Sequence, residues 1–171
     1  MKSKFKVESG RINISDPCYD LGQGVSVSAK NGEWIAYADF QDFGSWGKRV
    51  KSLVAEFSGT SSSVSSDQDS ICVDSGQAGI FDAKKFKDDD SVAKVSRVHD
   101  KSICEDEPWY SICCDRTLSD KQWGVIPNGC VSSSGFGDGC YPVSILKDDS
   151  GKAVRVEINF IDDEDDFTVT N

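Results

Sequence analysis

The side chains of this 171-residue chain that could do chemistry are mainly carboxylates placed beside glycines. The most unusual stretch runs from Ser132 to Pro142, where three glycines occupy alternate positions: Gly135, Gly137 and Gly139. Glycine at alternate positions lets a backbone or a ligand approach one side of a strand or bulge. The spacing matches neither G-x-G-x-x-G nor the Walker A pattern, so it predicts no phosphate cradle. Asp138 within it either caps a turn or faces a cleft as an acid, base or ligand.

Three other carboxylates lie where strands are expected to end. Asp74 and Asp82 flank a short glycine-containing turn with Gly76. Asp16 precedes Pro17, which forces an extended backbone and suits the exit of a strand. Carboxylates that converge from strand ends could bind a cation or divide acid and base roles. Turn chemistry explains the same residues, and Asp16 would then have only a structural role.

These pieces together resemble a known family. The segments ISDPCY (14–19), VDSGQAGIFD (73–82) and SSSGFGDGCYPV (132–143), in this order, are similar to the uncharacterised DUF4241 family. The Gly-Asp-Gly motif of that family corresponds to Gly137, Asp138 and Gly139. The resemblance covers most of the chain and implies no activity, cofactor or partner. Similar proteins occur in bacteria and their phages, and a phage origin would favour a role against host defences.

Nucleophilic and metal chemistry find little support in the sequence. A catalytic Cys-His or Ser-His pair would need the one histidine of the chain, His99. His99 lies in a charged segment and is expected to be exposed to solvent. No cysteine pair has C-x-x-C spacing. Cys113 and Cys114 would point to opposite faces of a strand, so a zinc site would need distant cysteines. The sequence predicts no metal site and implies no cofactor.

The composition of the chain limits which classes of partner it can bind. The formal net charge of −10 disfavours direct binding to nucleic acid or to an anionic membrane. The acidic run 162–166 indicates a solvated tail. The chain begins without a secretory apolar stretch and has no run of about 18 apolar residues. We therefore expect a cytoplasmic protein whose seven thiols stay reduced, most of them as small buried hydrophobes.

Most elements that could position these residues show a two-residue period. Residues 154–160 alternate apolar and polar side chains, residues 141–145 do the same, and turn residues lie between them at 148–151, which predicts a hairpin. A second hairpin is expected from 25–29 and 33–40 around Lys30, Asn31 and Gly32. The strand at 33–40 is apolar on both faces and is expected to be central.

The remaining segments are less regular. Residues 50–57 fit a strand or a helix, with the strand preferred. The serine-rich segment 59–69 predicts a flexible surface loop, followed by a short strand at 71–73. The spacing of Val92, Val95 and Val98 predicts one short helix within 83–101.

Together these elements predict a mainly β fold, a β-sandwich or a small barrel-like sheet core with one or two short helices; α+β is the alternative. We expect a single β-rich domain over 1–161 and an acidic tail over 162–171. Such a core would bring the glycine-spaced segment and its acidic neighbours to a common sheet edge.

The leading functional hypothesis is a non-catalytic binding module that recognises a small molecule or a partner protein. Its predicted surface consists of strand-end residues: Asp74, Gly76, Asp82, Ser134, Gly135, Gly137, Asp138, Gly139 and Tyr141. One alternative is a hydrolase that uses Asp16, Asp74 and Asp138, with or without a divalent cation. Another is an acidic decoy that occupies the nucleic-acid-binding site of a basic host protein. The composition carries no signal for an oligomeric state.

Overall fold

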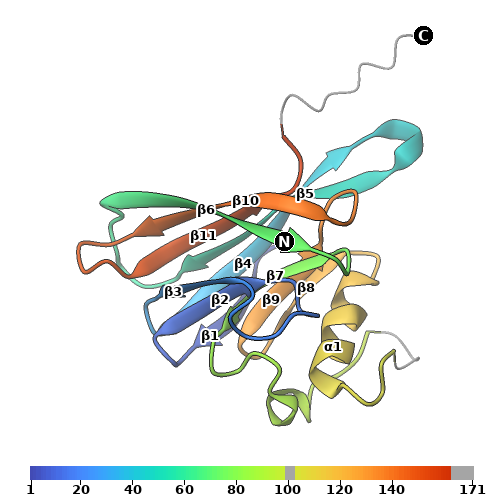
Figure 1. The fold of residues 1–171 in the computed structure, drawn as a ribbon, viewed down its shortest axis with the longest axis horizontal. Coiled ribbons are helices and arrows are strands. Elements are labelled where there is room, and N and C mark those ends of the chain that lie inside the picture. The colour runs from blue at the N-terminus through green and yellow to red at the C-terminus, as the bar shows by residue number, and fades with distance from the viewer. Residues whose placement is uncertain (99–102, 163–171) are drawn as a thin grey trace.

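The structure is a computed structural model, which describes residues 1–98 and 103–162. These residues form two β-sheets and one α-helix (Figure 1). The mainly β fold expected from the two-residue periods is confirmed, in its sandwich form. The histidine at position 99 and the acidic run beyond Asp162 lie outside the described residues.

The first sheet contains six strands that pair antiparallel with their neighbours. In spatial order they are β1 (Ser3–Val7), β4 (Gly32–Asp42), β5 (Lys48–Phe57), β11 (Ala153–Asn159), β10 (Gly139–Lys147) and β6 (Ser65–Val73). The hairpin formed by β4 and β5 extends beyond the rest of the sheet (Figure 1). Its tip carries the short 3-10 helix η1 (Gly44–Trp46).

The second sheet contains five antiparallel strands. In spatial order they are β3 (Val25–Ser28), β2 (Arg11–Ser15), β7 (Gln77–Asp82), β9 (Gly129–Ser133) and β8 (Trp123–Ile126). The main core lies between the two sheets, where Ile14 and Ile80 of the second sheet pack with Trp34 and Ile158 of the first. Burial of one apolar face of each sheet accounts for the sandwich.

A third layer covers the other face of the second sheet. It contains α1 (Pro108–Thr117) and the 3-10 helix η2 (Asp89–Val92). Phe81 of β7, Phe86 and Trp109 pack against one another there, with ring centroids 5.0 to 5.5 Å apart. This smaller second core fixes α1 on the sheet.

Two element predictions are confirmed in detail. Strands β10 and β11 form the expected hairpin, with Val143 opposite Ile158 and Ile145 opposite Val156. Residues 50–57 belong to strand β5, as preferred over a helix.

The predicted hairpin around Lys30, Asn31 and Gly32 is wrong. Strand β3 pairs with β2 in the second sheet, whereas β4 pairs with β1 and β5 in the first. The Lys30 N–H donates to the Ala153 carbonyl oxygen at 3.2 Å, and the Asn31 Oδ1 accepts from the Gly10 N–H at 2.6 Å. These bonds hold the segment 30–31 as it passes from β3 in the second sheet to β4 in the first, so the chain does not reverse into a hairpin here. Strand β4 has a neighbour on each side, but it lies next to the sheet edge and only one of its faces is fully buried.

The predicted surface loop at 59–69 is too long. Strand β6 begins at Ser65, and its polar first half pairs with the apolar strand β10. Pairing with a partner strand has overridden the weak strand preference of these residues.

The helix expected within 83–101 is also misplaced. The described part of this segment holds only η2, whose start is capped because the Asp88 side chain accepts from the Asp90 N–H. The α-helix lies later, at 108–117, and begins with a proline at its first turn. Its signal is the apolar set Trp109, Ile112 and Cys113, spaced as one helical face.

Two of the seven cysteines form a disulfide, so the expectation that all thiols stay reduced is wrong for this pair. Cys72 of β6 lies directly opposite Cys140 of β10, and the two sulfur atoms are bonded. Of the five free cysteines, Cys113, Cys114 and Cys130 are buried, as expected of small hydrophobes. Within the described part of the chain, none of the helices has the length and apolarity needed to cross a bilayer.

Candidate recognition site at the glycine-spaced loop

Asp16 anchors the turn that joins β6 to β7. Its Oδ2 accepts from the main-chain N–H groups of Asp74 and Ser75, both at 2.8 Å. Its Oδ1 accepts from the Cys18 N–H at 2.7 Å and from the Ser75 hydroxyl at 2.6 Å. The carboxylate is fully buried, so these four bonds compensate for the loss of its hydration. Asp16 is therefore bonded as a structural anchor of residues 74–75.

Asp138 holds the other end of the same turn. Its Oδ1 accepts from the Gly76 N–H at 2.9 Å, and the Gly76 carbonyl oxygen accepts from the Ser134 N–H at 3.0 Å. Gly76 has a φ of +67°, which favours glycine. The structure thus brings Asp16, Asp74 and Asp138 together around one turn, which joins the two sheets and is not the edge of a single sheet.

The groups beside Asp74 are neutral at physiological pH. The Tyr19 hydroxyl donates to the Asp74 carboxylate, and this hydrogen bond raises the pKa of Tyr19 to about 12. Burial, together with the neighbouring Asp16, raises the pKa of the Cys18 thiol to about 12. An activated nucleophilic thiol requires a lowered pKa, so Cys18 is not activated.

The glycine-spaced loop, residues 134–139, is shaped by hydrogen bonds within itself. The Ser134 hydroxyl donates to the Gly137 carbonyl oxygen at 2.7 Å. The Tyr141 hydroxyl lies 2.6 Å from the same oxygen and 3.0 Å from the Ser134 carbonyl oxygen. Gly135 and Gly137 have φ values of +62° and +121°. Gly139 begins β10 and pairs with Val73. These residues determine the shape of the loop rather than offering their polar groups to solvent.

The loop presents an aromatic side chain, Phe136. Its ring lies 4.9 Å from the ring of Phe43, on the β4–β5 hairpin, and the Arg49 guanidinium lies 5.9 Å from its centroid. Phe136 is 49% exposed, and Trp46 at the hairpin tip is 69% exposed. We use the name hairpin surface for these residues together with the exposed Phe40 of β4, all of which lie on the hairpin or on the loop beside it: Phe40, Phe43, Trp46, Arg49 and Phe136.

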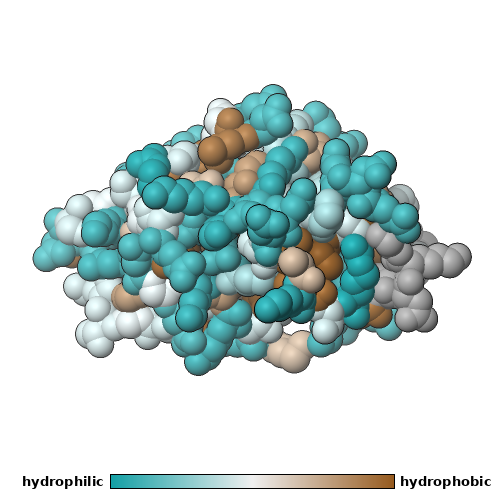
Figure 2. Space-filling view, turned by 90° about the horizontal axis from the view of Figure 1, so that it is seen from below, coloured by the Kyte–Doolittle hydropathy of each residue, from teal (hydrophilic) through white to brown (hydrophobic). Residues whose placement is uncertain are grey.

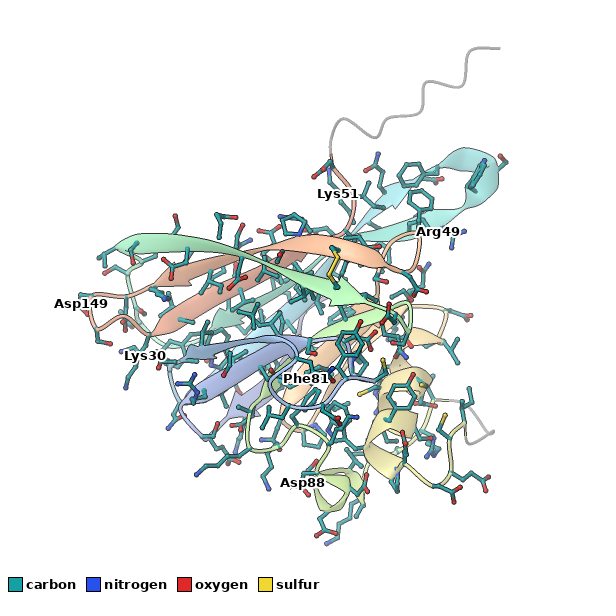
Figure 3. The ribbon with its side chains drawn as sticks, in the orientation of Figure 1. Lys30, Arg49, Lys51, Phe81, Asp88 and Asp149 are labelled. Atoms are coloured by element: carbon teal, nitrogen blue, oxygen red, sulfur yellow. A yellow bond between two sulfur atoms is a disulfide. The ribbon has the colours of Figure 1, made fainter. Side chains whose placement is uncertain are left out.

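The hairpin surface gathers every exposed aromatic side chain among residues 1–98 and 103–162. The face of the molecule seen in Figure 2 is mostly hydrophilic, with hydrophobic residues only in small groups. The segment 40–51 carries three cations, Lys48, Arg49 and Lys51, against one carboxylate, Asp42, in a chain of net charge −10. Arg49 and Lys51 lie where the hairpin leaves the body of the molecule (Figure 3).

Asp82 serves a different part of the fold. Its fully buried carboxylate accepts from the N–H groups of Glu8 at 2.6 Å, Ser9 at 2.8 Å and Lys84 at 2.9 Å. Burial alone would raise the pKa of Asp82, but these hydrogen bonds outweigh it and lower the pKa. Asp82 fixes the turn between β1 and β2 and does not join the turn at 74–76.

The residues of the hairpin surface on β4, η1 and β5 escaped the sequence analysis, which singled out acidic and glycine-rich motifs. A usable signal was present: the segment FGSWG (43–47) places two aromatic residues among turn-forming glycines, where no core can bury both.

One described hollow lies elsewhere, beside β8. It is a half-open pocket of about 380 Å³ lined in part by Met1, Arg116 and Trp123. It contains none of the residues predicted from the sequence. No three His, Cys, Asp or Glu side chains are placed to hold a metal ion in residues 1–98 and 103–162.

Comparisons with known proteins place the chain in a family. The family described as "Protein of unknown function (DUF4241)" matches residues 69–158, from β6 to β11. This range includes the turn at 74–76 and the glycine-spaced loop, whereas the ISDPCY segment with Asp16 lies before it. No curated protein and no solved structure matched the chain. Because the match covers more than half of the chain, this protein belongs to the DUF4241 family.

Proposed function

We propose that this protein is a non-catalytic binding module that recognises a protein partner through the hairpin surface. The observation that carries the proposal is the gathering of Phe40, Trp46 and Phe136, all exposed, on one projecting hairpin and the loop beside it. Exposed aromatic groups next to an arginine are typical of the residues that dominate protein interfaces.

Hydrogen bonds of the turn and of the loop beneath it give this surface a fixed shape. Asp16, Asp138 and Tyr141 hold the turn at 74–76 and the glycine-spaced loop, and this loop holds Phe136 against Phe43. A rigid aromatic surface loses little conformational entropy on binding. The carboxylates predicted to bind would then act on recognition indirectly, by positioning Phe136.

The charges suggest the chemistry of the partner. Lys48 and Arg49, the first two residues of β5, add positive charge to the hairpin of a chain whose net charge is −10. We propose a partner with an apolar patch edged by carboxylates, because complementary charges steer association and reject other acidic proteins.

The test begins with capture of partners from cells by the full-length protein. A captured candidate is then purified, and its affinity is measured for the wild type, for Trp46→Ala and for Phe136→Ala. Loss of an interface aromatic costs about 2 kcal/mol or more, so each variant should bind at least about 30-fold more weakly. Leu118→Ala is the matched control, because Leu118 is 58% exposed and lies on another face.

An affinity that stays the same in both aromatic variants contradicts the proposal. Binding that weakens equally in the Leu118 control contradicts it as well, because it places recognition elsewhere.

The other two hypotheses find less support. A carboxylate hydrolase would need Asp16 free to act as acid, base or ligand, but its oxygens already accept four hydrogen bonds. The acidic decoy would bind through negative charge, whereas the exposed aromatic surface carries a positive excess.

The cytoplasmic location stays a prediction. Reducing compartments disfavour disulfides, so the state of the Cys72–Cys140 pair in cells is a direct test of that location.

A further inference from the structure

Strand β6 provides the long open edge of the sandwich. It is nine residues long and has β10 as its only neighbour in the described sheet. The opposite edge strand, β1, is partly covered, because the Lys6 N–H donates to the Pro127 carbonyl oxygen and the Asn128 side chain donates to the Lys6 carbonyl oxygen. The edge strands of the second sheet, β3 and β8, are only four residues long.

The register of β6 shows which of its backbone groups face outward. Cys72 and Cys140 have Cα atoms 4.0 Å apart, the close spacing of an antiparallel pair without mutual hydrogen bonds. Pro142, which lacks an N–H, lies opposite Ser70 and belongs to the same alternation. The even-numbered residues of β6 therefore direct their N–H and C=O groups away from β10, toward the open side.

These outward groups form a regular array. They belong to Ser66, Gln68, Ser70 and Cys72, spaced as a new strand would need them. The Ser70 N–H already donates to the neighbouring Asp69 carboxylate at 2.8 Å. All of residues 65–70 are exposed, so this part of the edge is accessible to solvent.

Two carboxylates determine what the edge can accept. Asp67 and Asp69 project from the face that continues Ile71 and Val73, and Asp67 pairs with Lys147. A second copy of β6 added antiparallel about Gln68 would place Asp67 opposite Asp69 twice, and like charges in that position are destabilising. Charges at this place also oppose purely apolar strands. A strand with cations on that face would meet both carboxylates.

We propose that the open edge of β6 binds an extended segment of another protein that carries lysine or arginine at alternate positions. The segment adds as a seventh strand, and its backbone bonds to the outward groups of Ser66, Gln68 and Cys72. Its cations lie beside Asp67 and Asp69. This site is separate from the hairpin surface and does not depend on the function proposed above.

The test uses a short synthetic peptide that alternates lysine with threonine, and a matched peptide that alternates glutamate with threonine. The lysine peptide should bind the full-length protein and slow amide hydrogen exchange at Ser66, Gln68 and Cys72. Gln68→Pro removes one outward N–H and no bond to β10, because proline is tolerated on the open side of an edge strand. We expect it to weaken binding about tenfold or more.

Gln68→Ala is the matched control, because it removes the same side chain and keeps the N–H; it should bind the lysine peptide as the wild type does. Asp69→Lys should shift the preference toward the glutamate peptide. The proposal is overturned if the lysine peptide does not bind at millimolar concentration, if Gln68→Pro binds it unchanged, or if exchange slows elsewhere and not along β6. Equal binding of the two peptides to the wild type would also overturn it.

Discussion

Single aspartate side chains in this protein accept hydrogen bonds from main-chain N–H groups that have no backbone acceptor. Asp16 accepts from residues 74 and 75, Asp82 from residues 8 and 9, and Asp148 from Ser150 and Lys152. Each of the three lies where the chain leaves a strand and the N–H groups of a turn have no ladder to join. A carboxylate satisfies two or more such donors at once and forms stronger hydrogen bonds than a neutral acceptor.

The first prediction, at the residue scale, concerns Asp16. Replacing Asp16 with alanine leaves its main-chain donors at Cys18, Asp74 and Ser75 without an acceptor in a buried position. We expect the free energy of unfolding to fall by about 3 kcal/mol or more, measured by urea denaturation followed by circular dichroism. Asp20→Ala, at a highly exposed carboxylate, is the control and should change little. Equal stability of the two variants would show that Asp16 is not an anchor.

The sequence identified the position of these carboxylates better than their role. The glycine-spaced segment and its acidic neighbours were expected at a common edge; Asp16, Asp74 and Asp138 do meet around the turn at 74–76, whereas Asp82 lies at another turn. Their hydrogen-bond partners were not predictable, because the donors are backbone groups about 60 residues away in the chain. Phe136 was overlooked because an exposed phenylalanine between glycines carries no periodic signal.

At the scale of elements, one short turn connects the two sheets beside the proposed recognition site. Strand β6 ends the first sheet at Val73, and β7 begins in the second sheet at Gln77. The disulfide between Cys72 and Cys140 joins the end of β6, just before this turn, to the start of β10, just after the glycine-spaced loop. It lies two residues from Asp74 and two from Asp138, so it limits the separation of the turn from the glycine-spaced loop.

The second prediction concerns this disulfide. Changing both Cys72 and Cys140 to serine removes a cross-link that spans 68 residues of sequence. We expect the free energy of unfolding to fall by about 2 to 4 kcal/mol, measured by urea denaturation under oxidising conditions. Cys104→Ser, at an exposed free thiol, is the control.

A thiol titration gives an independent check of the same bond. The denatured, unreduced protein should react at five of its seven cysteines. Reaction at all seven would show that the disulfide does not form.

Elements with a local signal were predicted best. The hairpin of β10 and β11 has alternation in both strands and turn residues between them, and it formed as expected. The pairing of β3 with β2 rather than β4 depends on contacts between distant segments, which local periodicity does not contain. The first half of β6 is polar, and only its partner β10 makes it a strand.

For the whole molecule, the anchoring carboxylates couple folding to pH. The ion pair with Lys30 and the hydrogen bonds from Ser150 lower the pKa of Asp148, and hydrogen bonds lower that of Asp82. A carboxyl whose pKa is lower in the folded state stabilises the fold above its unfolded pKa of about 4. This contribution is lost as pH falls through the folded pKa.

The third prediction follows from this coupling. The free energy of unfolding should stay high near neutral pH and decline progressively below about pH 4, as both carboxylates take up protons. Asp148→Asn should be less stable than the wild type at neutral pH and should lose less stability on acidification. Asp149→Asn, at the exposed neighbouring residue, is the control and should show the same dependence of the free energy of unfolding on pH as the wild type. Urea denaturation of all three proteins at several acidic pH values measures this dependence. Parallel curves for the wild type and Asp148→Asn would refute the coupling.

The distribution of tryptophan over the molecule has a practical consequence. Trp34, Trp109 and Trp123 are no more than 5% exposed, whereas Trp46 is 69% exposed at the hairpin tip. A water-soluble quencher such as iodide should therefore reach the emission of one indole out of four. A partner bound at the hairpin surface would shield Trp46 from the quencher, so tryptophan fluorescence can report partner binding without an added label.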